Sequence, residues 1–324
     1  MSNSVQCDLC PRYCVIDQGQ SGVCRVRVNL DGKLRSVVYG FPCSLNVDPV
    51  EKKPCFHFLP GSKSLSTATV GCNLHCLNCQ NWEISQANPE DSQAYDCPPE
   101  KLVELAVQQS CQTISYTYTD PVVYYEYVLA TAQLAREKKI RNILVTAGYI
   151  NRVPWKKLLK HVEAVRIDLK GMTDEFYRKV TSATLKPVLD SLVATREAGV
   201  HLEVINLLIP TLNDSPADIK NLVKWVRVNL GEDTPLHFSR FFPQYKMKNL
   251  PPTPSETLDT ARKMAQDEGL HYVYIGNIMS KDGQNTRCPA CGKLLIDRSG
   301  FTLLRNELRD GKCACGKEIH GVWQ

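Results

Sequence analysis

The stretch Gly71-Cys-Asn-Leu-His-Cys-Leu-Asn-Cys-Gln-Asn-Trp82 places three thiols, those of Cys72, Cys76 and Cys79, in a CxxxCxxC spacing with no fourth cysteine beside them. Thiolates bind iron–sulfur clusters, and a 4Fe-4S cube has four irons, so three cysteines leave one iron open to an added ligand. An open metal position is typical of a catalytic site, whereas structural zinc is closed by four protein ligands. His75 lies inside the spacer, where it would clash with the neighbouring ligands. The stretch therefore predicts a catalytic iron–sulfur site.

The sequence around this motif resembles the radical SAM superfamily. GCNLHCLNCQNWEIS at 71–85, with DPVEKKPCFHFLPGS at 48–62 and SYTYTDPVVYYEY at 115–127, is similar to the AmmeMemoRadiSam branch, a relative of pyruvate formate-lyase activating enzymes. The resemblance covers nearly the whole chain. It implies two cofactors, a 4Fe-4S cluster and S-adenosylmethionine (SAM), and reductive cleavage of SAM to a 5′-deoxyadenosyl radical.

Length and composition indicate an ordinary globular enzyme. The chain has 324 residues, of which 43% are hydrophobic and 23% charged, with a net charge of +5. This length fits one barrel-like domain with small additions better than two equal halves. The mild positive charge permits an acidic partner without requiring one. No apolar run approaches the roughly 20 residues of a membrane span, so we expect a cytoplasmic protein without membrane contact.

Fifteen cysteines in a reducing compartment favour metal sites over disulfides. Near the N-terminus, a CxxC-x3-C-x9-C series among turn-forming residues predicts a closed four-thiolate site at Cys7, Cys10, Cys14 and Cys24. Zinc is the first choice for that site. A second iron–sulfur cluster is the alternative, because the resemblance is to activating enzymes that often carry one.

Four more cysteines near the C-terminus, Cys288, Cys291, Cys313 and Cys315, form two knuckles that each lead into glycine. This pattern is typical of a zinc ribbon, in which two knuckles clamp one ion. The second knuckle is CxC where the branch has CxxC, so His320 is considered as a replacement ligand.

Apolar strands alternate with amphipathic helices from Ser64 to about Gly276, which predicts a parallel sheet with right-handed crossovers. We expect an α/β protein built on a partial (β/α) TIM-like barrel. The expected domains are a Cys-rich N-terminal metal-knuckle and hairpin region (1–60), the radical SAM partial barrel (61–280) and a zinc-ribbon-like C-terminal region (281–324). Asp31-Gly32 predicts a hairpin turn. The charged residues of 46–54 are expected in a loop, where solvation alone explains them; the resemblance places this loop beside the active site.

Barrel enzymes carry their sites at the C-terminal ends of the strands, and this rule selects the polar residues to examine. By resemblance, the side chains and backbone that bind SAM belong to Asn78, Tyr118, Thr119, Asp120, Thr146, Gly148, Asp168 and Asn206. Asp120 stands where the branch usually has Glu, and Thr-Asp-Pro is also a plain helix cap. Trp82 is considered as a source of aromatic packing for adenine, because Asn78 stands where an aromatic residue is usual.

The expected catalytic residues are Lys170, His237 and Arg240. Lys170 follows Asp168 by one strand period and would pair with the SAM carboxylate, although an ordinary Asp–Lys ion pair has the same pattern. His237 and Arg240 form a candidate pair for contact with substrate or SAM. A histidine on an apolar strand is also often a satisfied core residue.

The resulting hypothesis is an enzyme whose 5′-deoxyadenosyl radical abstracts hydrogen from an unidentified substrate. One alternative is an activating enzyme that acts on a partner glycyl radical enzyme. A second alternative is a non-catalytic zinc-ribbon adaptor for nucleic acid. Expected partners are a low-potential electron donor, a ferredoxin or flavodoxin, together with the AMMECR-type and Memo-type proteins that give the branch its name.

Overall fold

The computed structural model describes residues 3–324, and its centre is an eight-stranded sheet in the order β12-β11-β10-β9-β8-β7-β6-β5. The strands β6 to β12 pair in parallel with their neighbours, and β5 pairs antiparallel with β6. Their bounds are β5 Ser44–Pro49, β6 Lys63–Ala68, β7 Thr113–Tyr116, β8 Arg141–Thr146, β9 Ala164–Asp168, β10 His201–Leu208, β11 Leu236–Arg240 and β12 Val273–Gly276. Sequential parallel strands with helical crossovers confirm the predicted partial (β/α) barrel.

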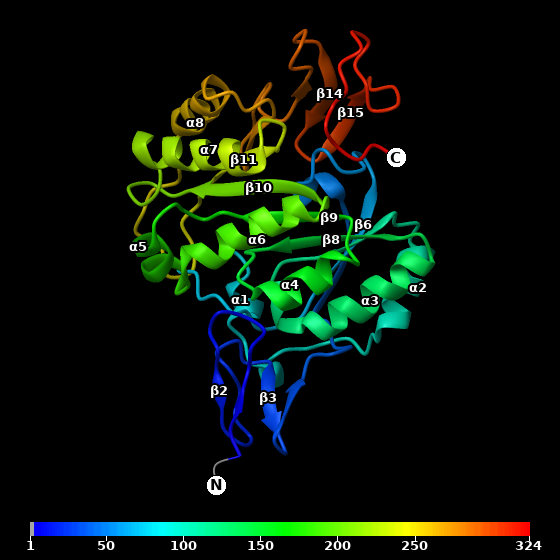
Figure 1. Cartoon of the computed structure of the whole chain (residues 1–324), viewed down its shortest axis with the longest axis vertical. Coiled ribbons are helices and arrows are strands. Elements are labelled where there is room, and N and C mark those ends of the chain that lie inside the picture. Colours follow the sequence, from blue (N-terminus) through cyan, green and yellow to red (C-terminus); the bar gives the residue numbers. More distant parts are fainter. Residues whose placement is uncertain (1–2) are drawn as a thin grey trace.

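Helices connect the parallel strands and cover one face of the sheet (Figure 1). The longer ones are α2 Pro99–Gln108, α3 Tyr125–Glu137, α4 Arg152–Leu159, α6 Leu185–Glu197, α7 Pro216–Leu230 and α8 Ser255–Asp267. The sequence explains both ends of α7. At its start, the Ser215 side chain accepts a hydrogen bond from the Asp218 amide and Pro216 is the first helical residue; at its end, Gly231 follows the last helical residue. Short helical turns complete the connections: η1 Val50–Lys52, α1 Trp82–Ser85, η2 Pro89–Asp91, η3 Pro121–Tyr124, α5 Asp174–Phe176 and η4 Tyr177–Thr181.

Two small sheet regions lie at opposite ends of the long axis (Figure 1). The N-terminal one contains β1 Val5–Gln6, β2 Val15–Ile16, β3 Arg27–Leu30 and β4 Lys33–Ser36. The strands β3 and β4 pair antiparallel around Asp31-Gly32, which confirms the predicted hairpin. The C-terminal sheet contains β13 Thr286–Arg287, β14 Leu294–Ser299 and β15 Thr302–Asn306.

The segment 44–59 departs from the sequence expectation. Residues 46–54 were expected in a loop, but 44–49 form the antiparallel edge strand β5. Its polar residues fit an edge strand, because the backbone on one side of such a strand pairs with no other strand. Beyond β5, Phe58 forms a bridge with Val322 near the end of the chain. The proposed domain boundaries at 60 and 280 stay a prediction. In the described part of the chain, no helix is long and apolar enough to span a lipid bilayer.

A buried polar network closes the deep end of the barrel. Glu203 on β10 is fully buried and accepts hydrogen bonds from the His201 ring at 3.1 Å and the His237 ring at 2.7 Å. It also accepts from the backbone amides of Phe56 at 3.0 Å and His57 at 2.8 Å. Burial opposes its charge, but the hydrogen bonds from His201 and His237 hold the pKa of Glu203 well below its usual range. The network thus joins the segment after β5 to the barrel strands.

His57 extends this network to the C-terminal region. Its Nδ1 lies 2.6 Å from the His320 carbonyl and must donate to it, so Nε2 of the neutral ring accepts from the Tyr274 hydroxyl, also at 2.6 Å. Burial lowers the pKa of His57 from 6.5 to about 3. The folded protein therefore holds this ring neutral at pH values at which the unfolded chain protonates it.

This histidine predicts a loss of stability in mild acid. The contribution of His57 to the free energy of unfolding is largest above pH 6.5. It decreases as the pH falls, because the unfolded state then binds a proton that the folded state excludes. From pH 7 to pH 5 the loss from this one group is about 2 kcal/mol. Guanidinium unfolding at both pH values measures it. We expect His57→Gln to be less stable at pH 7 and to lose less stability on acidification; an unchanged pH dependence in the variant would refute this role.

Candidate active site

A cavity of about 430 Å³ opens at the C-terminal ends of the parallel strands. Ten of the residues predicted from the sequence line it: Cys72, Cys76, Asn78, Cys79, Tyr118, Thr119, Asp120, Thr146, Asp168 and Lys170. They come from the loop after β6 and from the ends of β7, β8 and β9. The adjacent C-terminal ends of the strands therefore bring residues that are up to about a hundred positions apart into one cavity.

The cysteine loop runs between β6 and α1 and is fixed by backbone hydrogen bonds. The amide of His75 donates to the Thr181 carbonyl at 3.0 Å, and the amide of Leu77 donates to Val180 at 2.9 Å. Within the described residues, the cavity lining includes three cysteines and no fourth. The donor set fits a 4Fe-4S cluster with one open iron, and it does not supply a closed four-ligand site.

Gly71 enters the loop with φ of +86°, a backbone conformation that favours glycine. A Cβ at this position would lie 2.4 Å from the Cys24 carbonyl oxygen and 2.6 Å from the Val26 side chain. The N-terminal region therefore packs directly against the start of the cysteine loop. Arg12 strengthens the contact, because its Nε donates to the Asn73 carbonyl at 2.7 Å.

We expect Gly71→Ala to lower both stability and iron content. Positive φ alone costs a non-glycine residue about 1–3 kcal/mol, and the overlap with Cys24 adds to that cost. Gly199→Ala is the matched control, because Gly199 has φ of +69° but no atom within 4 Å of its added Cβ. Thermal unfolding and iron analysis after reconstitution measure both effects. Equal losses in the two variants would show that the contact with the N-terminal region is unimportant.

Asp120 is held rigidly at the end of β7. Its Oδ1 accepts from the Val122 amide at 3.1 Å and the Thr146 hydroxyl at 2.9 Å, and its Oδ2 accepts from the Ala147 amide at 2.9 Å. The bond to Val122 caps η3, which confirms the helix-cap interpretation. Burial raises the pKa of Asp120. The neighbouring Thr119 donates its hydroxyl to the Thr69 carbonyl at 2.8 Å.

A second acid on the cavity wall is shared by two cations. Asp168 accepts from Lys170 Nζ at 2.9 Å and forms a second ion pair with Arg166. The pairing of Asp168 and Lys170 foreseen from the sequence is therefore present, and both side chains also line the cavity. Lys170 can reach a ligand only by sharing or releasing this carboxylate.

Two predicted cofactor residues lie outside the cavity lining. Gly148 has φ of +67°, and a Cβ there would meet the side chains of Ile167 and Ser191 at 3.3 and 3.4 Å. Glycine at 148 thus serves a tight turn against protein atoms. Asn206 lies between two cavity-lining strand residues, so its side chain points to the opposite face, where it donates to the Leu169 carbonyl at 2.7 Å.

His237 and Arg240 do not line the cavity either, so their contact with SAM or substrate stays a prediction. The residue of β11 that does line it is Ser239. His237 lies two residues deeper on the same strand and is occupied by Glu203, as the core-histidine alternative foresaw. Arg240 is on the opposite face, where its Nε donates to the Thr253 carbonyl at 2.7 Å and its guanidinium covers Phe242.

The residues considered for adenine packing are arranged differently from the expectation. Trp82 stacks on Tyr245, with ring centroids 5.2 Å apart, and does not line the cavity. The Asn78 carbonyl accepts from the Gln244 side-chain amide at 3.0 Å. The segment after β11 therefore covers the cysteine loop from outside.

Lys52 and Lys53 line the cavity, in agreement with the expected position of residues 46–54 beside the active site. Other lining residues were not assigned to the site from the sequence: Arg166, Ser239, Asn277 and Phe301. Phe301 follows the tip of the β14–β15 hairpin, so its contact with the cavity depends on the tertiary placement of the C-terminal region.

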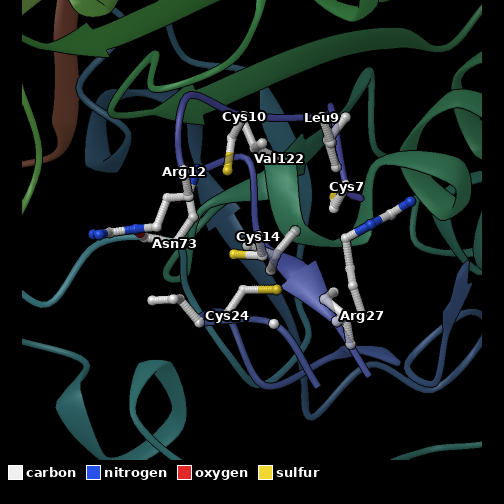
Figure 2. A pocket seen from close by; sticks show the side chains of 13 residues that line it. Cys7, Leu9, Cys10, Arg12, Cys14, Cys24, Arg27, Asn73 and Val122 are labelled. Atoms are coloured by element: carbon white, nitrogen blue, oxygen red, sulfur yellow. The ribbon is translucent and has the colours of Figure 1, made fainter. Parts of the chain in front are cut away.

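The four N-terminal cysteines line one small cavity together with Arg27 and Asn73 (Figure 2). In Figure 2 the side chains of Cys10, Cys14 and Cys24 come from separate turns of the chain. Asn73 belongs to the cysteine loop, so this site lies next to the loop that carries Cys72, Cys76 and Cys79. Burial raises the pKa of Cys10 to about 11 and also raises the pKa of Cys24, which a bound cation would reverse.

The C-terminal cysteines Cys288, Cys291, Cys313 and Cys315 converge tightly. All four sulfurs lie within 4.8 Å of one another, with Cys288 3.6 Å from Cys315 and Cys291 3.7 Å from Cys313. A tetrahedral zinc ion with bonds of about 2.3 Å sets its sulfurs about 3.8 Å apart, so these residues fit zinc despite the CxC knuckle. His320 instead stacks on His201, with ring centroids 5.9 Å apart.

Comparisons with known proteins agree with this geometry. The family model described as the Radical SAM superfamily matches residues 66–226. An uncharacterized protein of Methanocaldococcus jannaschii is 47% identical, over 98% of this chain and 95% of its own. The pyruvate formate-lyase-activating enzyme of Clostridium pasteurianum is 25% identical, over 52% of this chain and 72% of its own.

Solved structures show the same fold. A radical SAM methyltransferase from Sphaerobacter thermophilus superposes with a TM-score of 0.51 at 16% identity, over 68% of each chain. At that identity the likeness concerns the fold alone. The family match, these relatives and the three-cysteine cavity at the strand ends lead to one conclusion. This chain is an enzyme of the radical SAM superfamily.

Proposed function

We propose that this enzyme binds a 4Fe-4S cluster through Cys72, Cys76 and Cys79 and uses it to cleave SAM and abstract hydrogen from a substrate. The observation that carries the proposal is the shared cavity of these three cysteines with Asp120, Thr146 and Lys170. When bound and reduced, such a cluster supplies the electron that cleaves SAM to methionine and a 5′-deoxyadenosyl radical. A ferredoxin or flavodoxin would supply that electron.

The chain's own residues bind and orient SAM. Thr119 and Asp120 lie at the end of β7, where the ammonium group would bind, and Asp120 is held in place by three donors before any ligand arrives. Lys170 is placed to pair with the carboxylate of SAM if it shares Asp168. Tyr118 and Thr146 line the same cavity and complete the enclosure. Residues fixed in advance reduce the cost of ordering the site on binding.

Electron paramagnetic resonance tests this proposal. The protein is reconstituted without oxygen, reduced with dithionite and measured with and without SAM. We expect a signal from a reduced 4Fe-4S cluster whose shape changes when SAM is added, because SAM occupies the open iron. A cluster signal that SAM leaves unchanged would overturn the proposed role of the three-cysteine site.

Metal analysis tests the two outer cysteine sites. We propose zinc at the C-terminal site, whose sulfur spacing fits it. In the described chain, only the C-terminal thiols and the Glu232, Asp233 and His271 trio bring three or more ligand atoms within 4.8 Å of one another. The N-terminal thiols are more widely spaced, which favours the second iron–sulfur cluster over zinc there. About eight irons per chain would support that cluster, and about four irons with two zincs would refute it.

An activating enzyme for a glycyl radical enzyme is the second candidate function. It is favoured by relatives named as activating enzymes, among them the Clostridium pasteurianum protein and a 4-hydroxyphenylacetate decarboxylase activating enzyme of Clostridium scatologenes. Its test is the appearance of a glycyl radical signal on a partner protein. Participation of AMMECR-type and Memo-type proteins is a further proposal, tested by co-purification. The non-catalytic adaptor hypothesis is set aside, because the chain belongs to a superfamily of enzymes.

A further inference from the structure

One wall of the active-site cavity is cationic. Four cationic side chains line the cavity, those of Lys52, Lys53, Arg166 and Lys170, whereas two acids line it, Asp120 and Asp168. The proposed function assigns Asp120 and Lys170 to SAM. It leaves Lys52, Lys53 and Arg166 without a role.

The two lysines share a single carboxylate. Lys52 Nζ lies 2.8 Å from one oxygen of Asp48, and Lys53 Nζ lies 2.6 Å from the other. The Tyr118 hydroxyl donates to Asp48 as well, at 2.6 Å. One acid therefore faces two ammonium groups and can neutralise only one of their charges. The Lys53 side chain is 2% exposed, so water solvates it poorly.

Arg166 repeats this arrangement on the neighbouring side. It shares Asp168 with Lys170, and its Nε donates to the Lys53 carbonyl at 2.7 Å. That bond holds Arg166 against the backbone of Lys53, and the side chains of Lys52, Lys53 and Arg166 line the same cavity. Arg166 lies two residues before Asp168 on the same face of β9, which places it deeper in the barrel.

Lys53 and Arg166 are buried cations that each share their carboxylate with a second cation, an arrangement that costs free energy unless a further anion completes it. Burial lowers the pKa of Lys53 and lowers that of Arg166 to about 10, as expected for cations that the protein incompletely compensates. Arginine and lysine together are the usual recognition groups for phosphate and carboxylate. Beside them, Val145, Ile205 and Leu207 line the cavity with apolar side chains.

We propose that Lys52, Lys53 and Arg166 bind a small organic substrate through a phosphate or carboxylate group, with the apolar strand residues beside its carbon skeleton. This inference deepens the proposed function and rests on it. A glycine within a polypeptide carries no anionic group for these three cations to bind. The structure thus assigns a small anionic substrate in preference to a glycine on the backbone of a partner protein.

Calorimetric titration of the full-length, anaerobically reconstituted protein tests this inference. Inorganic pyrophosphate and malonate are the probes for phosphate and carboxylate, and each is titrated with SAM held at saturation. The variants are Lys52→Met and Arg166→Met. The Lys52 side chain is 45% exposed, so its replacement does not disturb the core. Lys186→Met is the matched control, because Lys186 is exposed on α6, pairs with Asp190 at 2.7 Å and does not line the cavity.

We expect at least one probe to bind the wild-type protein and the Lys186→Met control equally, and to bind Lys52→Met and Arg166→Met at least tenfold more weakly. The probe that binds identifies the group, phosphate or carboxylate. Binding of neither probe in the presence of saturating SAM, or equal binding by all variants, would overturn the inference. Formation of 5′-deoxyadenosine, assayed separately without a probe, shows whether the proposed function itself fails.

Discussion

Replacement of Cys76 by alanine is expected to abolish SAM cleavage. Cys76 is one of only three thiols that line the cavity within the described residues, so its loss leaves two ligands for the cluster. Two thiolates cannot hold a 4Fe-4S cube with one defined open iron. The expected result is loss of about four irons per chain and no 5′-deoxyadenosine above the background without enzyme. Iron analysis and chromatography after anaerobic incubation with SAM and dithionite measure both quantities.

Cys111→Ala is the matched control for this experiment. Cys111 is also buried, but it lies at the start of β7, at the end of the strand away from the cavity. The control should retain the iron content and the 5′-deoxyadenosine yield of the wild-type protein. If Cys76→Ala kept a full cluster and its cleavage activity, the assignment of the catalytic ligands would be wrong.

Replacement of Glu203 by alanine is expected to lower the free energy of unfolding more than the substitutions at His57 and Gly71. Its two oxygens accept four hydrogen bonds, from two imidazoles and two backbone amides, and the side chain is fully buried. Removal of one partner from a buried charged network costs about 3–5 kcal/mol. Because native proteins are stable by only about 5–15 kcal/mol, the variant should unfold at much lower denaturant concentration or express poorly.

Glu175→Ala separates this effect from the loss of any glutamate. Glu175 is 74% exposed and pairs with Lys179 at 2.6 Å on a helical surface. Exposed pairs of this kind contribute little to stability, because water and salt screen them. Guanidinium unfolding of both variants gives the comparison. A loss below about 1 kcal/mol in Glu203→Ala would show that the network does not hold the segment after β5 to the barrel.

Local patterns predicted most of the fold. The alternation of apolar strands with amphipathic helices identified β6 to β12, because parallel strands are buried on both faces and read as apolar runs. The edge strand β5 was missed, because its sequence Ser-Leu-Asn-Val-Asp-Pro carries polar residues that look like a loop. Pairing with β6 decides its structure, and that contact is not visible in the local sequence.

The strand-end rule predicted the site well where side-chain direction followed directly from position. It placed Asp120 and Lys170 in the cavity, whereas the side chain of Arg240 points to the opposite face. Alternation along β11 would have separated Arg240 from its neighbour Ser239, which lines the cavity. The role of Glu203 as partner of His237 could not be foreseen, because the two residues meet only when β10 and β11 pair.

Formation of 5′-deoxyadenosine tests the central claim most directly. The reconstituted wild-type protein is incubated without oxygen with SAM and dithionite, and 5′-deoxyadenosine and methionine are quantified. We expect both products in equal amounts, from a protein with at least about four irons per chain. A protein that binds zinc alone and leaves SAM intact would contradict this claim.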